Sequence, residues 1–445
     1  MSSVINHIPV DVLHAFWQEC ERLLLASQSE VQVYIEQAIQ AVQSHAKEHV
    51  PYYRNLTPFP EAWPTLSKYR LQQTTEDFWA MDVDASDCLL WQTSGSTGEP
   101  TRFLVDAWGQ TVREVSLLLS LSIAGVSLPH LKASISTDTV MIRLSSSEGL
   151  QQWHRPLPLL DNCLLQKFAV FEHPECDVDS VIEKILSLKP PCLAGDPQAF
   201  EILLSHWRVL YPEQTHCPYP VLFLSNGANV LSEPLRQKLE AFFGLAVSDC
   251  YAMAETSVIA SQCPQGSFHV HIPLNILESN NESSENPSAP LWVTHFPNAA
   301  MPLIRYETGD WGNVSTKSDC HCGLQWPILH TFEGRQRRFL MNSSGDPVSP
   351  SKIIPLLNQL PVAQYQLIQK TATDFELRYR IQNQSILNPS TEKASSDLDQ
   401  GIKTALQLAL SQAINEPAMT LAFSGSEQHL GEPGKKFQDI VVLGF

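Results

Sequence analysis

The sequence predicts an α/β fold divided into more than one domain. Its 445 residues exceed one average hydrophobic core. Short apolar segments that end in turn-forming residues alternate with segments of helical periodicity, as in sheets covered by helices. The expected strands cover 140–144, 191–197, 221–224 and 246–250, and the expected helices cover 181–188, 200–210 and 235–243. Ligands of such a sheet bind beyond the carboxyl ends of the strands, so 226–229 and 251–256 are expected on one rim.

Segments outside this alternation predict additional helices and a small second domain. Apolar residues recur with helical spacing over 10–47 and over 112–123. The last 105 or so residues combine an alternating strand pattern at 375–381, a helical pattern at 401–414 and a second strand near 421–423. Polar stretches at 278–290 and 389–396 are expected to be loops.

Composition narrows the class of protein. The formal charge of -18 disfavours nonspecific binding to nucleic acid or to anionic membranes. No apolar run approaches the roughly 20 residues of a membrane span, and residues 1–5 lack the basic start of a signal peptide, so a cytoplasmic protein is expected. The 10 cysteines are too sparse for a disulfide scaffold and are expected to be buried thiols or metal ligands.

Residues 91–101 concentrate glycines and hydroxyl side chains between two apolar runs. Glycine lets the backbone approach a ligand closely, and hydroxyl and N–H groups donate hydrogen bonds to phosphate oxygens. The segment is therefore interpreted as a phosphate loop formed by Thr93, Ser94, Gly95, Ser96, Thr97 and Gly98. It lacks the lysine and spacing of the Gly-x-x-x-x-Gly-Lys-Ser/Thr loop, and an ordinary turn between 88–91 and 103–105 is the alternative.

Two further segments place polar groups at the ends of apolar runs. Tyr251 and Glu255 present an aromatic ring and a carboxylate four residues apart; the ring could stack on a purine, and the carboxylate could hold Mg²⁺. Residues 302–310 are expected to form an apolar run that ends in a Thr-Gly-Asp turn, where Asp310 could accept both hydroxyls of a ribose. A plain hairpin turn is the alternative.

Four residues suggest a metal site. Cys263, His269, Cys320 and Cys322 supply three thiolates and an imidazole, a set that suits tetrahedral Zn²⁺. The Cys-x-Cys spacing is tighter than usual, so free thiols are an alternative, and His271 and His321 are competing ligands.

Three motifs of this chain resemble those of the acyl-adenylate-forming superfamily. They are Thr-Ser-Gly-Ser-Thr-Gly-x-Pro-Thr, Tyr-x-x-x-Glu and Tyr-x-Thr-Gly-Asp. Thr101 and the Cys/His set further resemble the phenylacetate-CoA ligase branch. The resemblance implies a large multi-subdomain α/β adenylation domain over 1–334, a hinge at 335–338 and a small mobile α+β domain over 339–445. It implies nucleotide contacts from the six loop residues, Gly227, Ala228, Tyr251, Ala252, Asp310 and Arg335, and catalytic roles for Thr97, Glu255 and Lys435.

The sequence departs from the superfamily pattern at three of these places. Ala252 and Ala254 replace a glycine and a hydroxyl residue, and Arg337 stands where the hinge usually carries Asp. The change at Ala254 removes a hydroxyl that could contact phosphate. For the catalytic lysine, Lys436 is the alternative to Lys435.

The implied activity is activation of a small carboxylic acid, expected to be aromatic, by Mg·ATP to acyl-AMP, followed by transfer to a thiol. Coenzyme A is the expected acceptor; an acyl carrier protein with its phosphopantetheine thiol is the alternative, and a homodimer is allowed. Zinc would be structural, because four protein ligands leave no open position. A fatty acyl-protein synthetase and a noncatalytic nucleotide-binding or interaction protein are the remaining alternatives.

Overall fold

The computed structural model describes residues 8–57, 62–92, 101–146, 152–171, 176–227, 231–279, 288–335, 339–348, 350–357, 359–360, 362, 364–380, 398–426, 430 and 440–443. Several predicted site residues lie outside these ranges: the whole loop 93–100, Ala228, the hinge positions 336–338, and both Lys435 and Lys436.

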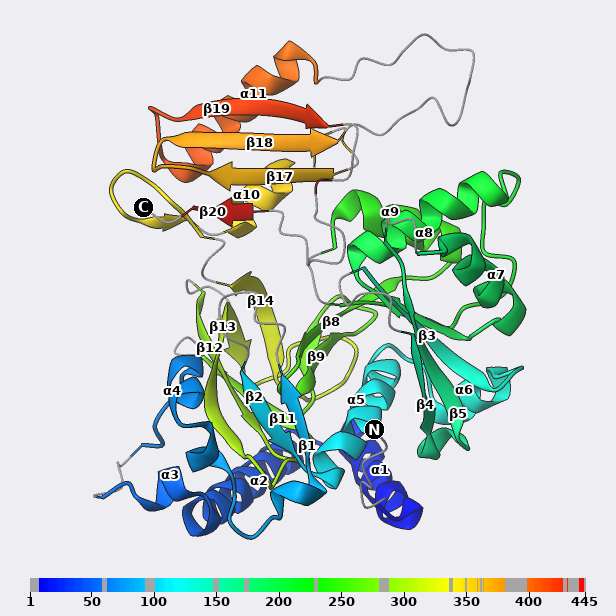
Figure 1. Ribbon diagram of the computed structural model, residues 1–445, viewed down its shortest axis with the longest axis vertical. Coiled ribbons are helices and arrows are strands. Elements are labelled where there is room, and N and C mark those ends of the chain that lie inside the picture. Colours follow the sequence, from blue (N-terminus) through cyan, green and yellow to red (C-terminus); the bar gives the residue numbers. More distant parts are fainter. Residues whose placement is uncertain are drawn as a thin grey trace.

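The chain begins with helices that pack beneath the rest of the fold (Figure 1). Helix α1 spans Val10–Leu24, and α2 spans Gln28–His49. Ser27 starts α2 with a capping box, in which its hydroxyl accepts from the Glu30 N–H while the Glu30 carboxylate accepts from the Ser27 N–H. Two short helices follow, α3 (Pro51–Arg54) and α4 (Lys68–Gln73), with 3-10 turns at Thr75–Phe78 and Ala85–Asp87.

A 12-stranded sheet organises the large part of the molecule, in the order β11-β12-β13-β14-β10-β9-β8-β7-β6-β3-β5-β4. Strands β5, β3, β6, β7 and β8 are mutually parallel. Their bounds are β3 Thr139–Ser145, β4 Trp153–Leu157, β5 Cys163–Ala169, β6 Cys192–Gly195, β7 Phe223–Asn226 and β8 Val247–Met253.

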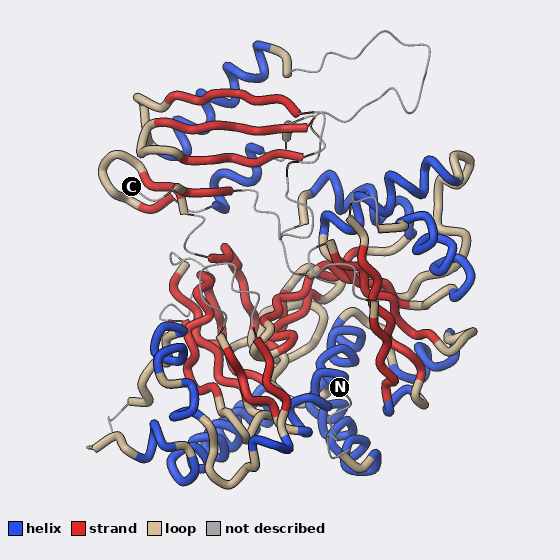
Figure 2. Tube along the Cα trace, viewed as in Figure 1, coloured by secondary structure: helices blue, strands red, loops and turns tan. Residues whose placement is uncertain are grey.

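Helices cover both faces of this parallel half, as Figures 1 and 2 show. On one face α7 (Val178–Leu188), α8 (Pro197–Leu210) and α9 (Glu233–Phe243) bury an apolar core against the sheet. On the other, α1, α5 (Ala107–Ile123) and α6 (Leu128–Ser134) share a second core with β3. This layered arrangement confirms the predicted α/β class.

The other half of the sheet is antiparallel. It consists of β9 Ser257–Gln262, β10 Phe268–Val270, β11 Asn275–Ser279, β12 Ala289–His295, β13 Leu303–Ser315 and β14 Ile328–Arg335. A two-stranded hairpin, β1 (Leu89–Gln92) with β2 (Arg102–Val105), packs into the same core as β12 and β13. The predicted phosphate loop therefore joins the two strands of this hairpin.

The C-terminal part has its own sheet and its own core. Strands β17 (Gln364–Gln369), β18 (Asp374–Arg380), β19 (Thr420–Ser426) and β20 (Ile440–Val442) form a sheet in the order β19-β18-β17-β20. Helices α10 (Pro350–Leu357) and α11 (Gln400–Ile414) contribute to the same core, and β15 (Leu340–Met341) pairs with β16 (Pro347–Val348) before them. Figure 1 shows this smaller unit beside the ends of β13 and β14.

The described helices include none that is by itself long and apolar enough to cross a membrane. Helices α5 and α6 pass that test only as a pair bent by 97°.

Candidate functional site

The corner between β8 and β9 brings Tyr251 and Glu255 to one rim. Strand β8 continues through Tyr251 to Met253, residues 254–256 turn the chain, and β9 begins at Ser257 with a φ of 65°. The Val258 N–H donates to the Ser116 hydroxyl of α5 at 3.2 Å. This bond fixes the corner against α5 and so positions Glu255.

Asp310 meets Tyr251 across the sheet. The Tyr251 hydroxyl donates to Asp310 Oδ2 at 2.9 Å, and both side chains are buried. The Tyr251 ring also packs on Phe332, with 4.4 Å between ring centroids. The structure therefore joins two of the predicted nucleotide residues directly, through a hydroxyl that the sequence analysis had assigned no part.

The Thr-Gly-Asp segment is not a turn that ends a strand, so that expectation is wrong. Strand β13 runs on to Ser315. On β12, Pro290 pairs with Trp311 and Trp292 pairs with Glu307, so three residues of β13, 308–310, stand opposite the single residue Leu291. Gly309 has a φ of +78°, a conformation that glycine adopts without strain. The segment is thus a bulge within a long strand, and the bulge sets the position of the Asp310 carboxylate.

Glu255 lies beside a third strand. The Tyr306 hydroxyl of β13 donates to Glu255 Oε1 at 3.4 Å, and the Tyr306 ring packs edge-on against Phe103 of β2. Because Phe103 stands in the β1–β2 hairpin, the predicted metal-binding carboxylate lies near the strands that flank the predicted phosphate loop.

Arg113, which no predicted motif includes, connects these parts. Its Nη2 donates to the Ala254 carbonyl at 2.8 Å, and its guanidinium lies 4.2 Å from the centroid of the Trp91 ring. Burial lowers the pKa of Arg113 to about 10, against the opposing effect of the Glu255 charge, so the guanidinium stays protonated at neutral pH. A single basic residue in the apolar stretch 112–123 was the available signal.

The ends of the predicted loop are held although the loop itself lies outside the described residues. Gln92 pairs with Arg102 in the β1–β2 hairpin, so the loop begins and returns at adjacent backbone positions. Thr101 is buried, and its hydroxyl accepts from Gln72 Nε2 at 3.0 Å.

The remaining predicted nucleotide residues lie on neighbouring strands. Gly227 directly follows β7, and its N–H donates to the Gly195 carbonyl at 3.0 Å. Ala252 is exposed near the end of β8. Arg335 ends β14 opposite Asp310 in the strand register.

The four predicted zinc ligands form a cluster at the far end of β9 and β10. One ligand atom from each of Cys263, His269, Cys320 and Cys322 lies within 4.8 Å of the others. Cys322 Sγ lies 3.2 Å from His269 Nε2, and Cys263 Sγ lies 3.6 Å from Cys320 Sγ.

The surroundings of this cluster fit a metal. Nδ1 of His269 faces the Trp326 carbonyl at 3.4 Å, which leaves Nε2 directed at the thiols, the arrangement typical of histidine ligands. Of the competing histidines, His271 is buried with Nε2 against the Ser261 hydroxyl at 2.9 Å. Burial raises the pKa of the Cys263 thiol, and a bound cation would favour its thiolate form.

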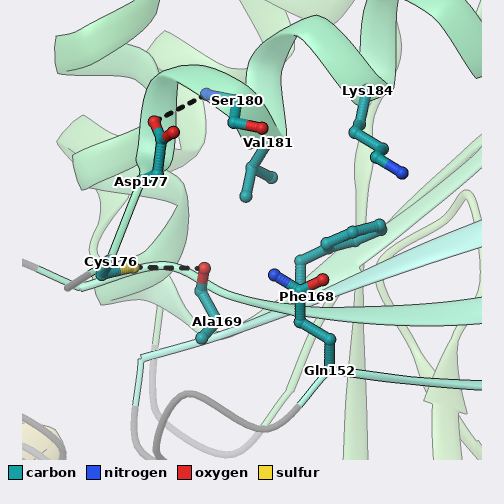
Figure 3. A pocket seen from close by; sticks show the side chains of 8 residues that line it. All are labelled: Gln152, Phe168, Ala169, Cys176, Asp177, Ser180, Val181 and Lys184. Atoms are coloured by element: carbon teal, nitrogen blue, oxygen red, sulfur yellow. Dashed lines mark hydrogen bonds between the residues drawn. The ribbon is translucent and has the colours of Figure 1, made fainter.

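A separate pocket of about 120 Å³ lies between β5 and the start of α7 (Figure 3). The Cys176 thiol donates to the Ala169 carbonyl there at 3.4 Å. The pocket is well below the roughly 300 Å³ at which ligand pockets begin, and none of its lining residues belongs to the rim formed by β8 and β13.

No protein-family model matches the chain, and no curated protein matches it in sequence. Solved structures do match. A 2-hydroxyisobutyryl-CoA ligase in the postadenylation state, in complex with 2-HIB-AMP, has a TM-score of 0.69 at 16% identity, over 95% of this chain and 91% of the other. The same ligase in an open conformation with 2-HIB-AMP and CoA scores 0.58 at 15% identity, over 92% and 90%. An ATP-bound RpMatB-BxBclM chimera scores 0.51 at 14% identity, over 81% and 68%.

The chain therefore has the fold of the AMP-forming acyl-CoA ligases, with a large N-terminal and a smaller C-terminal domain. This confirms the fold that the predicted superfamily implies. The phenylacetate-CoA ligase branch stays a prediction.

Proposed function

We propose that this protein is an acid–thiol ligase that forms AMP. In the first half-reaction a carboxylate oxygen attacks the α-phosphorus of ATP, the bond to the β-phosphate breaks, and acyl-AMP and pyrophosphate result. In the second, a thiolate attacks the acyl carbon, the acyl–phosphate bond breaks, and the thioester and AMP leave.

One observation carries the proposal: two sequence motifs that are far apart in the chain meet on one rim, beside the hairpin whose strands flank the third. Tyr251 donates a hydrogen bond to Asp310, and Tyr306 donates one to Glu255. Arg113 donates a hydrogen bond to the corner that carries Glu255, and its guanidinium stacks on Trp91 of the β1–β2 hairpin. The shared fold of the acyl-CoA ligases supports the same conclusion.

In this proposal three of the described residues have defined tasks. Asp310, oriented by the Tyr251 hydroxyl, accepts hydrogen bonds from the ribose hydroxyls. Arg113 carries positive charge next to the phosphates and fixes the corner. Glu255 would hold Mg²⁺, which supplies charge neutralisation on the phosphates when bound. Binding both substrates side by side removes much of the entropy cost of their encounter.

The residues outside the described ranges keep their predicted tasks. Thr93, Ser94, Ser96 and Thr97 donate hydrogen bonds to phosphate oxygens, and Lys435, on a small domain that turns at 335–338, neutralises the developing charge.

The zinc cluster is structural and ties the β9–β10 hairpin to the segment 320–322.

The acid is proposed to be aromatic and the acceptor to be coenzyme A. The choice of an aromatic acid rests on the resemblance to the phenylacetate-CoA ligase branch. For the acceptor, the basic residues Arg335, Arg337, Arg338, Lys435 and Lys436 suit phosphate groups on an otherwise acidic chain. They also suit an acidic carrier protein, which makes the acceptor an outcome of the test.

The test is pyrophosphate release from ATP with a panel of benzoate-type, short hydroxylated and C8 to C14 acids. Free coenzyme A or a phosphopantetheinylated carrier is then added, and thioester is followed by mass. Fastest turnover of an aromatic acid with thioester on coenzyme A is expected. Faster turnover of fatty acids would overturn the aromatic assignment, thioester on the carrier alone would overturn coenzyme A, and no release with any acid would overturn the ligase.

A further inference from the structure

A second group of metal-binding side chains lies at the end of α2, away from both the rim and the cysteine cluster. His45 and His49 are one helical turn apart and face the same way, with 4.9 Å between ring centroids. Asp82, from the segment after the first 3-10 turn, lies against both: its Oδ2 is 3.8 Å from His45 Nδ1 and 3.8 Å from His49 Nε2. One ligand atom of each residue lies within 4.8 Å of the other two.

These separations match ligands around an ion better than they match hydrogen bonds. Both gaps of 3.8 Å are too long for a hydrogen bond. Two ligand atoms bound tetrahedrally to Zn²⁺ at about 2.1 Å are roughly 3.4 Å apart, so a contraction of a few tenths of an ångström suffices. The surface pair His206–Asp179 shows the contrast, since its Nδ1 and Oδ1 close to 2.8 Å.

The second nitrogen of His45 is already engaged as in metal sites. His45 Nε2 lies 3.0 Å from the Ala299 carbonyl, which can only accept, so Nε2 donates there and Nδ1 is the ring nitrogen that faces Asp82. A backbone carbonyl that fixes the tautomer in this way is a recurrent partner of ligating histidines.

The backbone around the three side chains is tied together. The Met81 N–H donates to the His49 carbonyl at 2.9 Å, and the Ala80 N–H donates to the Ala300 carbonyl at 2.9 Å. Beneath them lies an apolar cluster that includes Val42, Ala46 and Ala80. The ligands therefore stand on a fixed base, a condition for binding without a large ordering cost.

We propose that His45, His49 and Asp82 form a three-ligand site for a transition-metal ion of the Zn²⁺ type. Two imidazoles and one carboxylate suit Zn²⁺, Co²⁺ or Ni²⁺ and disfavour Mg²⁺, which prefers oxygen. The side chains are 24%, 29% and 38% exposed, so an ion can enter and water can take the open position. The ion exchanges more readily than one held by the four-ligand cysteine cluster, and it joins α2 to the segment at Asp82.

Zn²⁺ titration of the purified full-length protein, followed by calorimetry, tests the site. We expect the wild type to bind one exchangeable equivalent, and His49→Ala and Asp82→Asn to weaken its affinity at least about tenfold. His206→Ala is the matched control, because it removes an exposed histidine that is paired with a single aspartate. Zn²⁺ should also raise the melting temperature of the wild type and of the control, and raise it less in the two site variants.

Melting curves without added metal establish that each variant is folded. Titration curves of His49→Ala and Asp82→Asn that coincide with the wild type would overturn the proposal. So would loss of the exchangeable equivalent in Cys320→Ser while both site variants retain it, because the ion would then belong to the cysteine cluster.

Discussion

The hydroxyl of Tyr251 donates a 2.9 Å hydrogen bond to Oδ2 of Asp310, across 59 positions of sequence. The bond uses one of the several acceptor sites of the carboxylate and so fixes its orientation. Buried polar groups that are held in this way are suited to binding a ligand with defined geometry.

Tyr251→Phe should therefore raise the KM for ATP about three- to tenfold with little change in kcat, because it removes the orienting bond and keeps the aromatic ring. Asp310→Asn should raise it further. Tyr219→Phe is the matched control, since the Tyr219 hydroxyl is buried without a hydrogen-bond partner among the described residues. Steady-state kinetics with varied ATP measure the effect, and an unchanged KM in both site variants would remove this pair from nucleotide binding.

Arg113→Met should lower carboxylate-dependent pyrophosphate exchange at least about tenfold, because it removes both the bond to Ala254 and the charge beside Glu255. Arg113→Lys should recover only part of the rate, since lysine cannot stack on Trp91 as a planar guanidinium does. Lys132→Met, which breaks an ordinary ion pair with Asp161, controls for loss of charge. A lower melting temperature with an unchanged exchange rate would limit Arg113 to a structural role.

Cys320→Ser should release the zinc that the wild type retains through dialysis against a weak chelator. Elemental analysis should find about one such ion per wild-type chain, and the variant should melt at a lower temperature, because structural zinc contributes folding free energy. Cys163→Ser, a partly buried cysteine outside the cluster, should behave as the wild type. Metal-free wild type of full stability would reject the zinc site.

Glu114 should make the protein less stable as the pH rises from about 5 to 8. Burial raises its pKa from 4.5 to about 7, while Oε1 accepts from the Leu159 N–H at 3.0 Å. Between these two values the folded state holds a proton that the unfolded state has lost, so stability falls with rising pH, by at most about 3 kcal/mol. Urea unfolding should show this slope in the wild type and a flatter profile in Glu114→Gln. Parallel profiles would contradict the assignment.

Local patterns in the sequence were sufficient for the helices and for much of the rim. The expected helix 401–414 is α11, Gln400–Ile414, and the expected helix 200–210 begins three residues earlier, where Asp196 caps it. Periodicity and caps are local properties, so one sequence can reveal them. The clustering of Cys263, His269, Cys320 and Cys322 was expected from the resemblance to the phenylacetate-CoA ligase branch, since the spacing alone left free thiols as an alternative.

Features that depend on distant partners could not be predicted in this way. The bulge at Gly309 exists because β12 pairs on both sides of it, and β12 was not assigned as the partner of β13. Arg113 acquires its position from Ala254, 141 positions away. Asp82 meets His45 and His49 only because the chain returns to the end of α2.

The most direct test of the proposed ligase activity is exchange of labelled pyrophosphate into ATP, with and without a carboxylate. We predict exchange that requires the acid, a fall of at least about a hundredfold in Lys435→Ala with nearly unchanged ATP affinity, and little change in Lys436→Ala, since the lysine acts on developing charge. The opposite order would place the catalytic lysine at 436. Undiminished exchange in the double variant, or none in the wild type with any acid, would contradict the proposed chemistry.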